Sequence, residues 1–235
     1  MTSRLVALVV EAHDPARLAR FWADLLGRTS VEDSHGVLVP GSATQLGLRF
    51  VASTSARVGP DRMHLHLTST DPADQQHTVD RALDLGARHL DVGQRPDEGH
   101  VVLADPEGYA LCVIEPGTAF LAGCGALGEV TCAGSRAVGL FWAATLGWPL
   151  VWDNGAETAV QSPRGGTKVS WDGPPVPPRH GRNRQRFELA VQADDLPDEV
   201  DRLVRLGAAR LAGAEPGAVE LADPDGNEFS LRPSR

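Results

Sequence analysis

The sequence has few cysteines, no long hydrophobic run and no excess of basic residues. The apolar stretch at residues 5–10 is far too short to span a bilayer, and it lacks the cationic flank and cleavage site of a signal peptide. We therefore expect a cytoplasmic protein with no membrane partner. The three cysteines, Cys112, Cys124 and Cys132, cannot all pair and show no CxxC spacing, which favours reduced, buried thiols.

Basic charge is scarce along the whole chain. There are 22 Lys and Arg residues against 31 Asp and Glu, a formal net charge of −9, and no Lys/Arg stripe offsets the resulting repulsion of a phosphate backbone. Nucleic acid is therefore not an expected partner. Hydrophobic residues at 42% and charged residues at 23% are typical of packed globular domains, and a length of 235 residues favours two of them.

Three motifs recur in the same order, which indicates a duplicated unit. F-W-x-x-x-L-G occurs at residues 21–27 and 141–147, L-G-A at 85–87 and 206–208, and L-A-D-P-[E/D]-G at 103–108 and 221–226. Residues 115–117, Glu-Pro-Gly, break helices and strands between the copies. We predict one domain at residues 1–116, a linker at 117–125 and a second domain at 126–235.

Each unit predicts two modules of the order strand, helix and three strands. In the first module, residues 5–10 have strand length, Asp14 and Pro15 are typical of a helix start, and Gly27 supplies a left-handed stop. The buried stripe of its helix includes Phe21 and Leu25. The further predicted strands of the first unit lie at 29–32, 36–39, 45–52, 63–68, 88–92, 100–103 and 110–114, with a helix capped by Asp71 and stopped by Gly86.

The last two strands of each unit are predicted to form a hairpin. Residues 105–108 and 223–226 place Asp, Pro and Gly where a type I turn favours them. The second unit repeats the pattern, with apolar helix segments at 138–146 and 200–206 whose buried residues include Phe141 and Leu203. Residues 173–184, reading GPPVPPRHGRNR, are either an extended linker between modules or a loop that folds over a cavity mouth.

These motifs together resemble the glyoxalase and bleomycin-resistance group of the vicinal-oxygen-chelate superfamily. The elements of the resemblance are the D-P-capped helix ending in F-W-x-x-L-L-G, the strand H-L-H-L at residues 64–67, and then L-G-A and D-P-E-G. The resemblance covers nearly the whole chain, twice. It implies an α+β fold of two glyoxalase-like domains, each made of paired βαβββ modules that curve into an open barrel around a cavity.

Enzymes of that family hold a divalent metal, and the resemblance implies where the ligands would lie. The first ligand, seven residues before the helix cap, falls on Ala7 in one module and His64 in the next, and the expected carboxylate falls on Cys112. In the second unit the corresponding positions are Leu127, Arg186 and Ser230, none of them a family ligand. A cation needs three or four converging donors, so we expect no metal and no cofactor.

A different donor set in the first unit stays an alternative. Strand alternation puts His66 on the same face as His64, and Glu11 on the face of Ala7, so a His–Cys–Glu or His–His–Cys set with Cys112 is conceivable. In the same way, Arg186 and Glu188 share a face, where burial would require pairing with each other or with a polar ligand. The expected cavity residues are His64, His66, Cys112, Glu11, Trp152, Trp171, Arg186, Glu188 and Ser230.

Two functional hypotheses follow from these residues. The first is a metal-independent protein that binds or sequesters a small, partly aromatic molecule, as the resistance branch of the family does, because four of the five tryptophans lie after residue 140. The alternative is a lyase, isomerase or dioxygenase of the same superfamily in which His64 is a catalytic base or a metal ligand. In both cases the partner is a small molecule, and a homodimer stays an open alternative.

Overall fold

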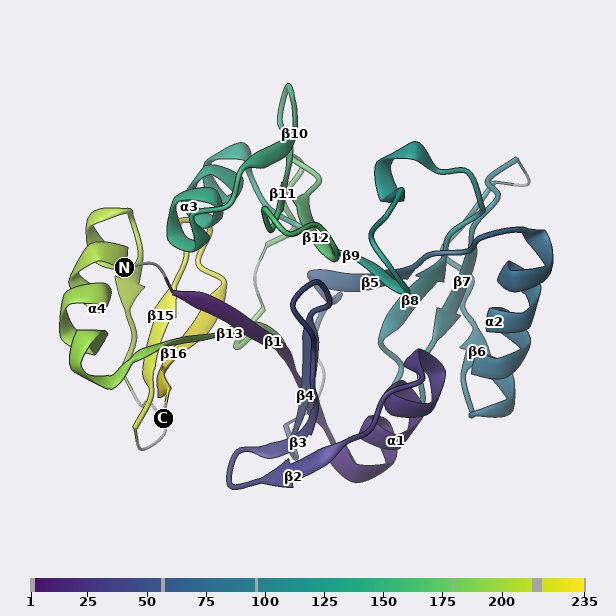
Figure 1. Cartoon of the computed structure of the whole chain (residues 1–235), viewed down its shortest axis with the longest axis horizontal. Coiled ribbons are helices and arrows are strands. Elements are labelled where there is room, and N and C mark those ends of the chain that lie inside the picture. The colour runs from purple at the N-terminus through teal and green to yellow at the C-terminus, as the bar shows by residue number, and fades with distance from the viewer. Residues whose placement is uncertain (1–2, 56–57, 96, 179, 213–216, 235) are drawn as a thin grey trace.

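Four βαβββ modules follow one another along the chain, in the order that the sequence predicts (Figure 1). The computed structural model describes residues 3–55, 58–95, 97–178, 180–212 and 217–234. The first half contains β1 Arg4–Ala12, α1 Pro15–Leu26, β2 Val31–Asp33, β3 Gly36–Val39, β4 Gly47–Ala52, β5 Met63–Leu67, α2 Pro72–Asp84, β6 Arg88–His89, β7 Val101–Ala104 and β8 Ala110–Val113. The short strands β2 and β6 differ most from their predicted bounds.

The second half repeats this order after a short 3₁₀ turn, η1, at Ala119–Leu121. Its elements are β9 Leu127–Cys132, α3 Arg136–Leu146, β10 Leu150–Asn154, β11 Glu157–Gln161, β12 Lys168–Trp171, β13 Gln185–Gln192, the 3₁₀ turn η2 Ala193–Asp195, α4 Leu196–Arg205, β14 Ala209–Arg210, β15 Val219–Ala222 and β16 Glu228–Ser234. None of the helices in the described part of the chain is both long enough and apolar enough to cross a bilayer.

The predicted helix signals in the first half are confirmed. The Asp14 side chain accepts a hydrogen bond from the backbone N–H of Arg17, and Asp71 does the same for Asp74, so each carboxylate satisfies a donor of the first turn. Gly27 ends α1 with φ of 62°, a left-handed conformation that glycine adopts without a steric cost. Local chemistry therefore sets where these helices begin and end.

The strands form two eight-stranded sheets. Each sheet combines one module from the first half of the chain with one module from the second half. Sheet A has the order β14-β15-β16-β13-β1-β4-β3-β2, and sheet B the order β10-β11-β12-β9-β5-β8-β7-β6. The central contacts are antiparallel, β1 with β13 and β5 with β9. The first module therefore shares a sheet with the fourth, and the second with the third. Whether each half folds as an independent domain stays a prediction.

The predicted hairpin turn connects the last two strands of each half and contacts the helix of the preceding module. The backbone N–H of Gly108 bonds the Asp105 carbonyl at 2.8 Å, and that of Gly226 bonds the Asp223 carbonyl at the same distance. Each Asp side chain also accepts the indole N–H of a helix tryptophan, Trp22 to Asp105 at 3.2 Å and Trp142 to Asp223 at 3.3 Å. The recurring F-W and D-P motifs thus lie in contact across two modules.

One large hydrophobic core lies between the sheets and their helices. Phe21, Leu25, Phe141 and Leu203 are all buried in it, as predicted. The helices lie on the outer sides of the sheets (Figure 1), and we call the opposite side of each sheet its inner face. Alternating strand residues point either into the core or onto the inner face, so every polar residue on the inner face is available to a site.

Candidate functional site

Two histidines and a cysteine converge on the inner face of sheet B. Along β5, Met63, Leu65 and Leu67 enter the core, so His64 and His66 point to the inner face. Cys112 on β8 is the register partner of His66 in the parallel β5–β8 pair. One ligand-type atom from each of His64, His66 and Cys112 lies within 4.8 Å of the others. The structure therefore brings together three of the residues that the sequence singles out.

A fourth group, Glu129 on β9, completes this cluster from the other half of the chain. Glu129 is the register partner of His66 in the antiparallel β5–β9 pair, and its Oε2 lies 2.8 Å from His66 Nδ1. His66 Nε2 lies 2.9 Å from His64 Nε2. The carboxylate and both rings thus form one hydrogen-bonded chain. We call His64, His66, Cys112 and Glu129 the sheet B cluster.

Sequence reasoning missed Glu129 and expected Leu127 at this position. A β-bulge explains the error, because the register passes from His66 opposite Glu129 to Leu67 opposite Leu127 and skips Gly128. The extra residue reverses the alternation, so Leu127 enters the core while Glu129 faces the cluster. Gly128 allows this close pairing, because a Cβ there would lie only 2.7 Å from Thr68 Cγ2. The glycine inside this strand was the available signal.

The two histidines of the cluster carry different charges at neutral pH. Burial opposes protonation of His66, but hydrogen bonds to Cys112 and Glu129 and the negative charge of Glu129 raise its pKa to about 9. Burial and the positive charge of His66 lower the pKa of His64 to about 4. At neutral pH His66 therefore donates both ring N–H groups, one to Glu129 and one to a neutral His64. A conjugate acid of such low pKa makes His64 a weak base.

An aromatic pocket of about 280 Å³ adjoins the cluster through Glu129. Phe120, from η1, packs edge-on against Trp152 with ring centroids 5.9 Å apart, and the Lys168 ammonium lies 4.1 Å from the Phe120 centroid. Trp152 is 42% exposed, whereas Trp171 is almost fully buried. Both expected tryptophans line the pocket. The full lining is Phe120, Glu129, Trp152, Glu157, Thr158, Ser170, Trp171 and Asp172.

Ion pairs fill the inner face of sheet A. Arg186 Nη1 lies 2.9 Å from Glu11 Oε1, and Glu188 Oε2 lies 3.1 Å from Arg49 Nε and 3.3 Å from Arg232 Nε. Arg49 also pairs with Asp33 at 2.7 Å, and Ser230 is buried as the register partner of Glu188. The expected residues Glu11, Arg186, Glu188 and Ser230 therefore come together here.

The expectation that Glu11 could join His64 and Cys112 was wrong. It rested on the first two modules sharing one inner face. Because β1 pairs with β13 while β5 pairs with β9, Glu11 lies in sheet A and the histidines lie in sheet B. Arg186 and Glu188 are both buried, but they do not pair with each other. Arg186 pairs with Glu11, and Glu188 pairs with Arg49. Long-range strand pairing decided both outcomes.

Within the part of the chain that the structure describes, a metal ion would find suitable donors only in the sheet B cluster. Among the described residues, His64, His66 and Cys112 form the one group of three or more candidate ligands that lie close enough together. Two imidazoles and a thiolate would suit a borderline cation. Glu129, which holds the opposite nitrogen of His66, would orient that ligand from behind. The residues therefore fit a metal.

A model of the glyoxalase-like domain family matches the chain twice, at residues 7–114 and 129–232. The chain belongs to this family. The tandem glyoxalase-like protein thus has the vicinal-oxygen-chelate fold that its sequence motifs indicate. Sequence comparison finds no match among curated proteins.

Solved structures resemble this glyoxalase-like protein over nearly its full length. Glyoxalase I from Zea mays superposes with a TM-score of 0.69 at 15% identity, covering 99% of this chain and 92% of the maize chain. A "putative dioxygenase" from Bacillus subtilis superposes with a TM-score of 0.65 at 14% identity, covering 98% of this chain and 84% of that one. At such low identity the likeness supports the fold, and function has to be argued from the site.

Proposed function

We propose that this glyoxalase-like protein binds a small, partly aromatic molecule on the inner face of sheet B. The observation that carries the proposal is the position of the sheet B cluster next to the aromatic pocket, with Glu129 common to both. A planar apolar group would pack against Phe120 and Trp152, and its oxygen atoms would meet the polar cluster. In this proposal the ligand contacts the protein directly and no metal is needed.

The hydrogen bonding of the cluster supports direct recognition of a polar group. His66 is held from both sides, by Glu129 and by His64, so its positive charge stays fixed near the pocket. A protonated imidazole whose partners hold it in place stabilises negative charge on a nearby ligand oxygen. Ser170, which also lines the pocket, offers a hydroxyl that can donate or accept.

Tryptophan fluorescence tests this proposal. Catechol, an aromatic probe with two neighbouring oxygens, should quench emission from the full chain saturably, and Trp152→Phe should reduce that quenching to the share that comes from Trp171. Trp148→Phe serves as the matched control because Trp148 packs against the core rather than lining this pocket, and it should leave the titration unchanged. Equal quenching in wild type and Trp152→Phe would show that the probe binds elsewhere.

A metal-dependent enzyme is the second candidate, and the convergence of His64, His66 and Cys112 favours it. These three residues would hold the ion, with Glu129 orienting His66. A bound divalent cation would supply Lewis acidity, polarising a substrate oxygen. Both candidate functions use the same cavity on sheet B. They differ in whether the cluster holds a metal and whether the bound molecule is converted to a product.

Metal analysis of protein purified without chelator separates the two candidates. Stoichiometric Fe, Mn, Ni, Cu or Zn that is lost in His64→Ala and retained in His89→Ala would favour the enzyme, because His89 is exposed on β6 and lies outside the cluster. Protein without stoichiometric metal that still shows saturable, Trp152-dependent quenching by catechol would favour direct binding.

A further inference from the structure

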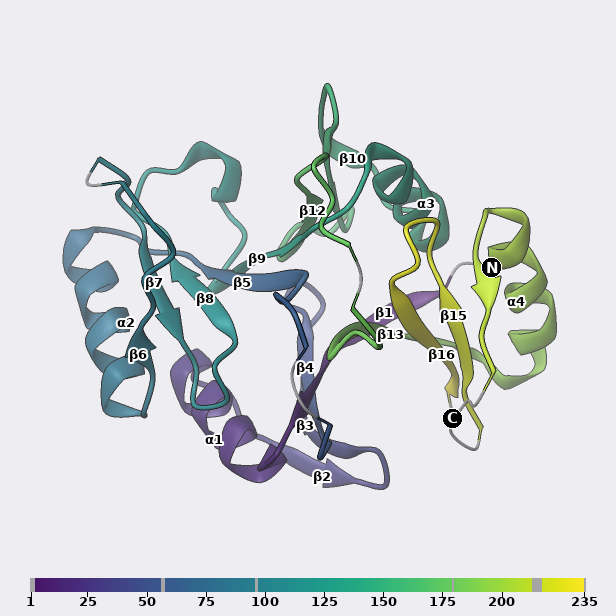
Figure 2. The same cartoon turned by 180° about the vertical axis from the view of Figure 1, so that it is seen from behind.

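A second cavity, of about 510 Å³, lies away from the sheet B cluster, between two connections that link the sheets. One connection leads from β4 to β5, and the other leads from β12 to β13 across the molecule (Figure 2). The two connections touch, because a Cβ on Gly59 would lie 2.8 Å from the ring of His180. The Pro-rich segment 173–184 therefore helps to enclose a cavity as well as linking modules.

The lining of this cavity is unusually basic for a chain of net charge −9. Among the described residues, four arginines line it against two carboxylates, Glu11 and Asp61, so guanidinium charges exceed carboxylate charges by two before His180 is counted. The arginines are Arg62, Arg182, Arg184 and Arg186. A concave site with excess charge of one sign attracts ligands of the opposite sign.

Arg184 is held rigidly by neutral oxygens. Its Nε donates to the Tyr109 hydroxyl at 2.9 Å, and its Nη1 donates to the Ser55 carbonyl at 2.5 Å. Its Nη2 lies 3.3 Å from the backbone carbonyl of Glu11, whose carboxylate is paired with Arg186 instead. Arg184 is thus held by neutral oxygens, and no carboxylate of the described residues pairs with it.

Within the described part of the chain, Arg62 adds a buried donor that has no partner. Arg62 Nη2 reaches only the Ala133 carbonyl, at 3.5 Å, and among the described residues its buried Nε has no hydrogen-bond partner. Native proteins rarely leave a buried guanidinium N–H unsatisfied, so this donor points to a ligand that accepts hydrogen bonds.

We propose that this cavity binds the oxyanion group of a small molecule, a phosphate ester or a carboxylate, between Arg62 and Arg184. A guanidinium presents its N–H donors in a planar fork that matches the oxygens of phosphate and carboxylate. The site is separate from the sheet B cluster and shares none of its residues. The two proposals can therefore fail independently.

Calorimetric titration of the full chain with inorganic phosphate, and separately with succinate, tests the proposal. We expect saturable binding of at least one anion, and the one that binds identifies the oxyanion class. Arg62→Gln should weaken binding about tenfold or more, since charge-assisted hydrogen bonds are lost. Arg20→Gln, at an exposed position of α1, removes the same charge and should leave affinity unchanged. No binding of either anion, or equal weakening in both variants, would overturn the proposal.

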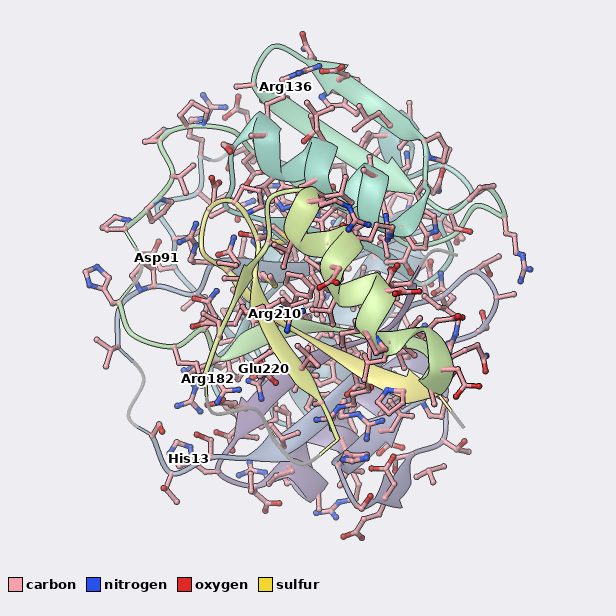
Figure 3. All side chains as sticks on the ribbon, turned by 90° about the vertical axis from the view of Figure 1, so that its left-hand side faces the viewer. His13, Asp91, Arg136, Arg182, Arg210 and Glu220 are labelled. Carbon is pink, nitrogen blue, oxygen red and sulfur yellow. The ribbon has the colours of Figure 1, made fainter. Side chains whose placement is uncertain are left out.

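A second variant keeps the test informative if Arg62→Gln does not fold. Arg182 is at the rim, where its side chain is 51% exposed and its Nη2 lies 3.7 Å from Glu220 (Figure 3), so its replacement should not disturb folding. Arg182→Gln should weaken anion binding about twofold to threefold, and added NaCl should weaken binding to the wild type as well, because an exposed charge acts through screened electrostatics. Affinity that responds to neither change would contradict the proposal.

Discussion

The two inner faces are built from equivalent modules but carry different chemistry. On sheet A, each buried carboxylate of Glu11 and Glu188 lies against an arginine, and no histidine or cysteine takes part in these pairs. On sheet B, the corresponding strands carry two histidines, a thiol and a single carboxylate. The same scaffold therefore holds one face of buried ion pairs and one face with a cluster of histidines, a thiol and a carboxylate.

The helix core should contribute equally to stability in both halves of the chain. It is therefore the reference for the effects expected on the two inner faces. Phe21→Ala and Phe141→Ala each remove a buried ring packed edge-on against a helix tryptophan, 5.4 Å and 5.5 Å away between centroids. Each should lower the free energy of unfolding by about 3 to 5 kcal/mol. Urea denaturation measures both. Costs that differ by more than about 2 kcal/mol would show that the duplicated cores are not equivalent.

Removing the central carboxylate of sheet A should have the next largest effect. Glu188 is 3% exposed and is shared by Arg49 and Arg232, so Glu188→Ala leaves buried positive charge with less compensation. We expect a loss of about 3 kcal/mol in the free energy of unfolding. The control is Asp201→Ala, which breaks the exposed pair with Arg210 and should cost less than about 1 kcal/mol. A near-neutral Glu188→Ala would mean that the ion pairs do not stabilise sheet A.

The sheet B cluster should make stability depend on pH in the alkaline range. His66 has a folded-state pKa of about 9, above the value of about 6.5 for an unfolded histidine. Its contribution is therefore fully present below about pH 6.5 and is lost as the pH rises through 9, by about 3 kcal/mol in all.

Urea denaturation at pH 6.5, 8 and 9.5 in the presence of a chelator measures this loss. His66→Gln is the comparison, because other groups that titrate in this range contribute equally to both proteins. The wild type should lose more stability than the variant between pH 6.5 and 9.5. Parallel pH profiles for the two proteins would rule out a charged His66 at neutral pH.

The comparison also shows which features a sequence of this kind can predict. Residues Asp14, Gly27 and Asp105 act on their immediate neighbours, so the helix ends and the hairpin turn were predicted correctly. The period of two along β5 correctly placed His64 and His66 on one face. These are local properties of the chain, and local physical chemistry is enough to derive them.

Features that depend on distant strands were predicted poorly. The pairing of β1 with β13 and of β5 with β9 joins segments from opposite halves, and it decides that Glu11 meets Arg186 rather than His64. Glu129 was missed because the bulge at Gly128 shifts the strand by one residue, and a shift of one residue moves every later side chain to the other face.

The smallest stability effect is expected at Trp152, the residue most directly tied to ligand binding on sheet B. Its side chain is 42% exposed, and its contacts are the edge of Phe120 and a hydrogen bond to Glu157 at 3.2 Å. Trp152→Ala should therefore change the free energy of unfolding by only about 0.5 kcal/mol, the range for surface positions.

Trp171→Ala is the contrasting variant, because Trp171 is 1% exposed and lies in the core, where truncation should cost about 3 to 5 kcal/mol. Denaturation of both variants, together with catechol titration of Trp152→Ala, separates folding from binding. If Trp152→Ala is as stable as the wild type but no longer binds catechol, Trp152 contributes to ligand binding in the aromatic pocket. A large loss of stability would instead show that Trp152 mainly supports the fold.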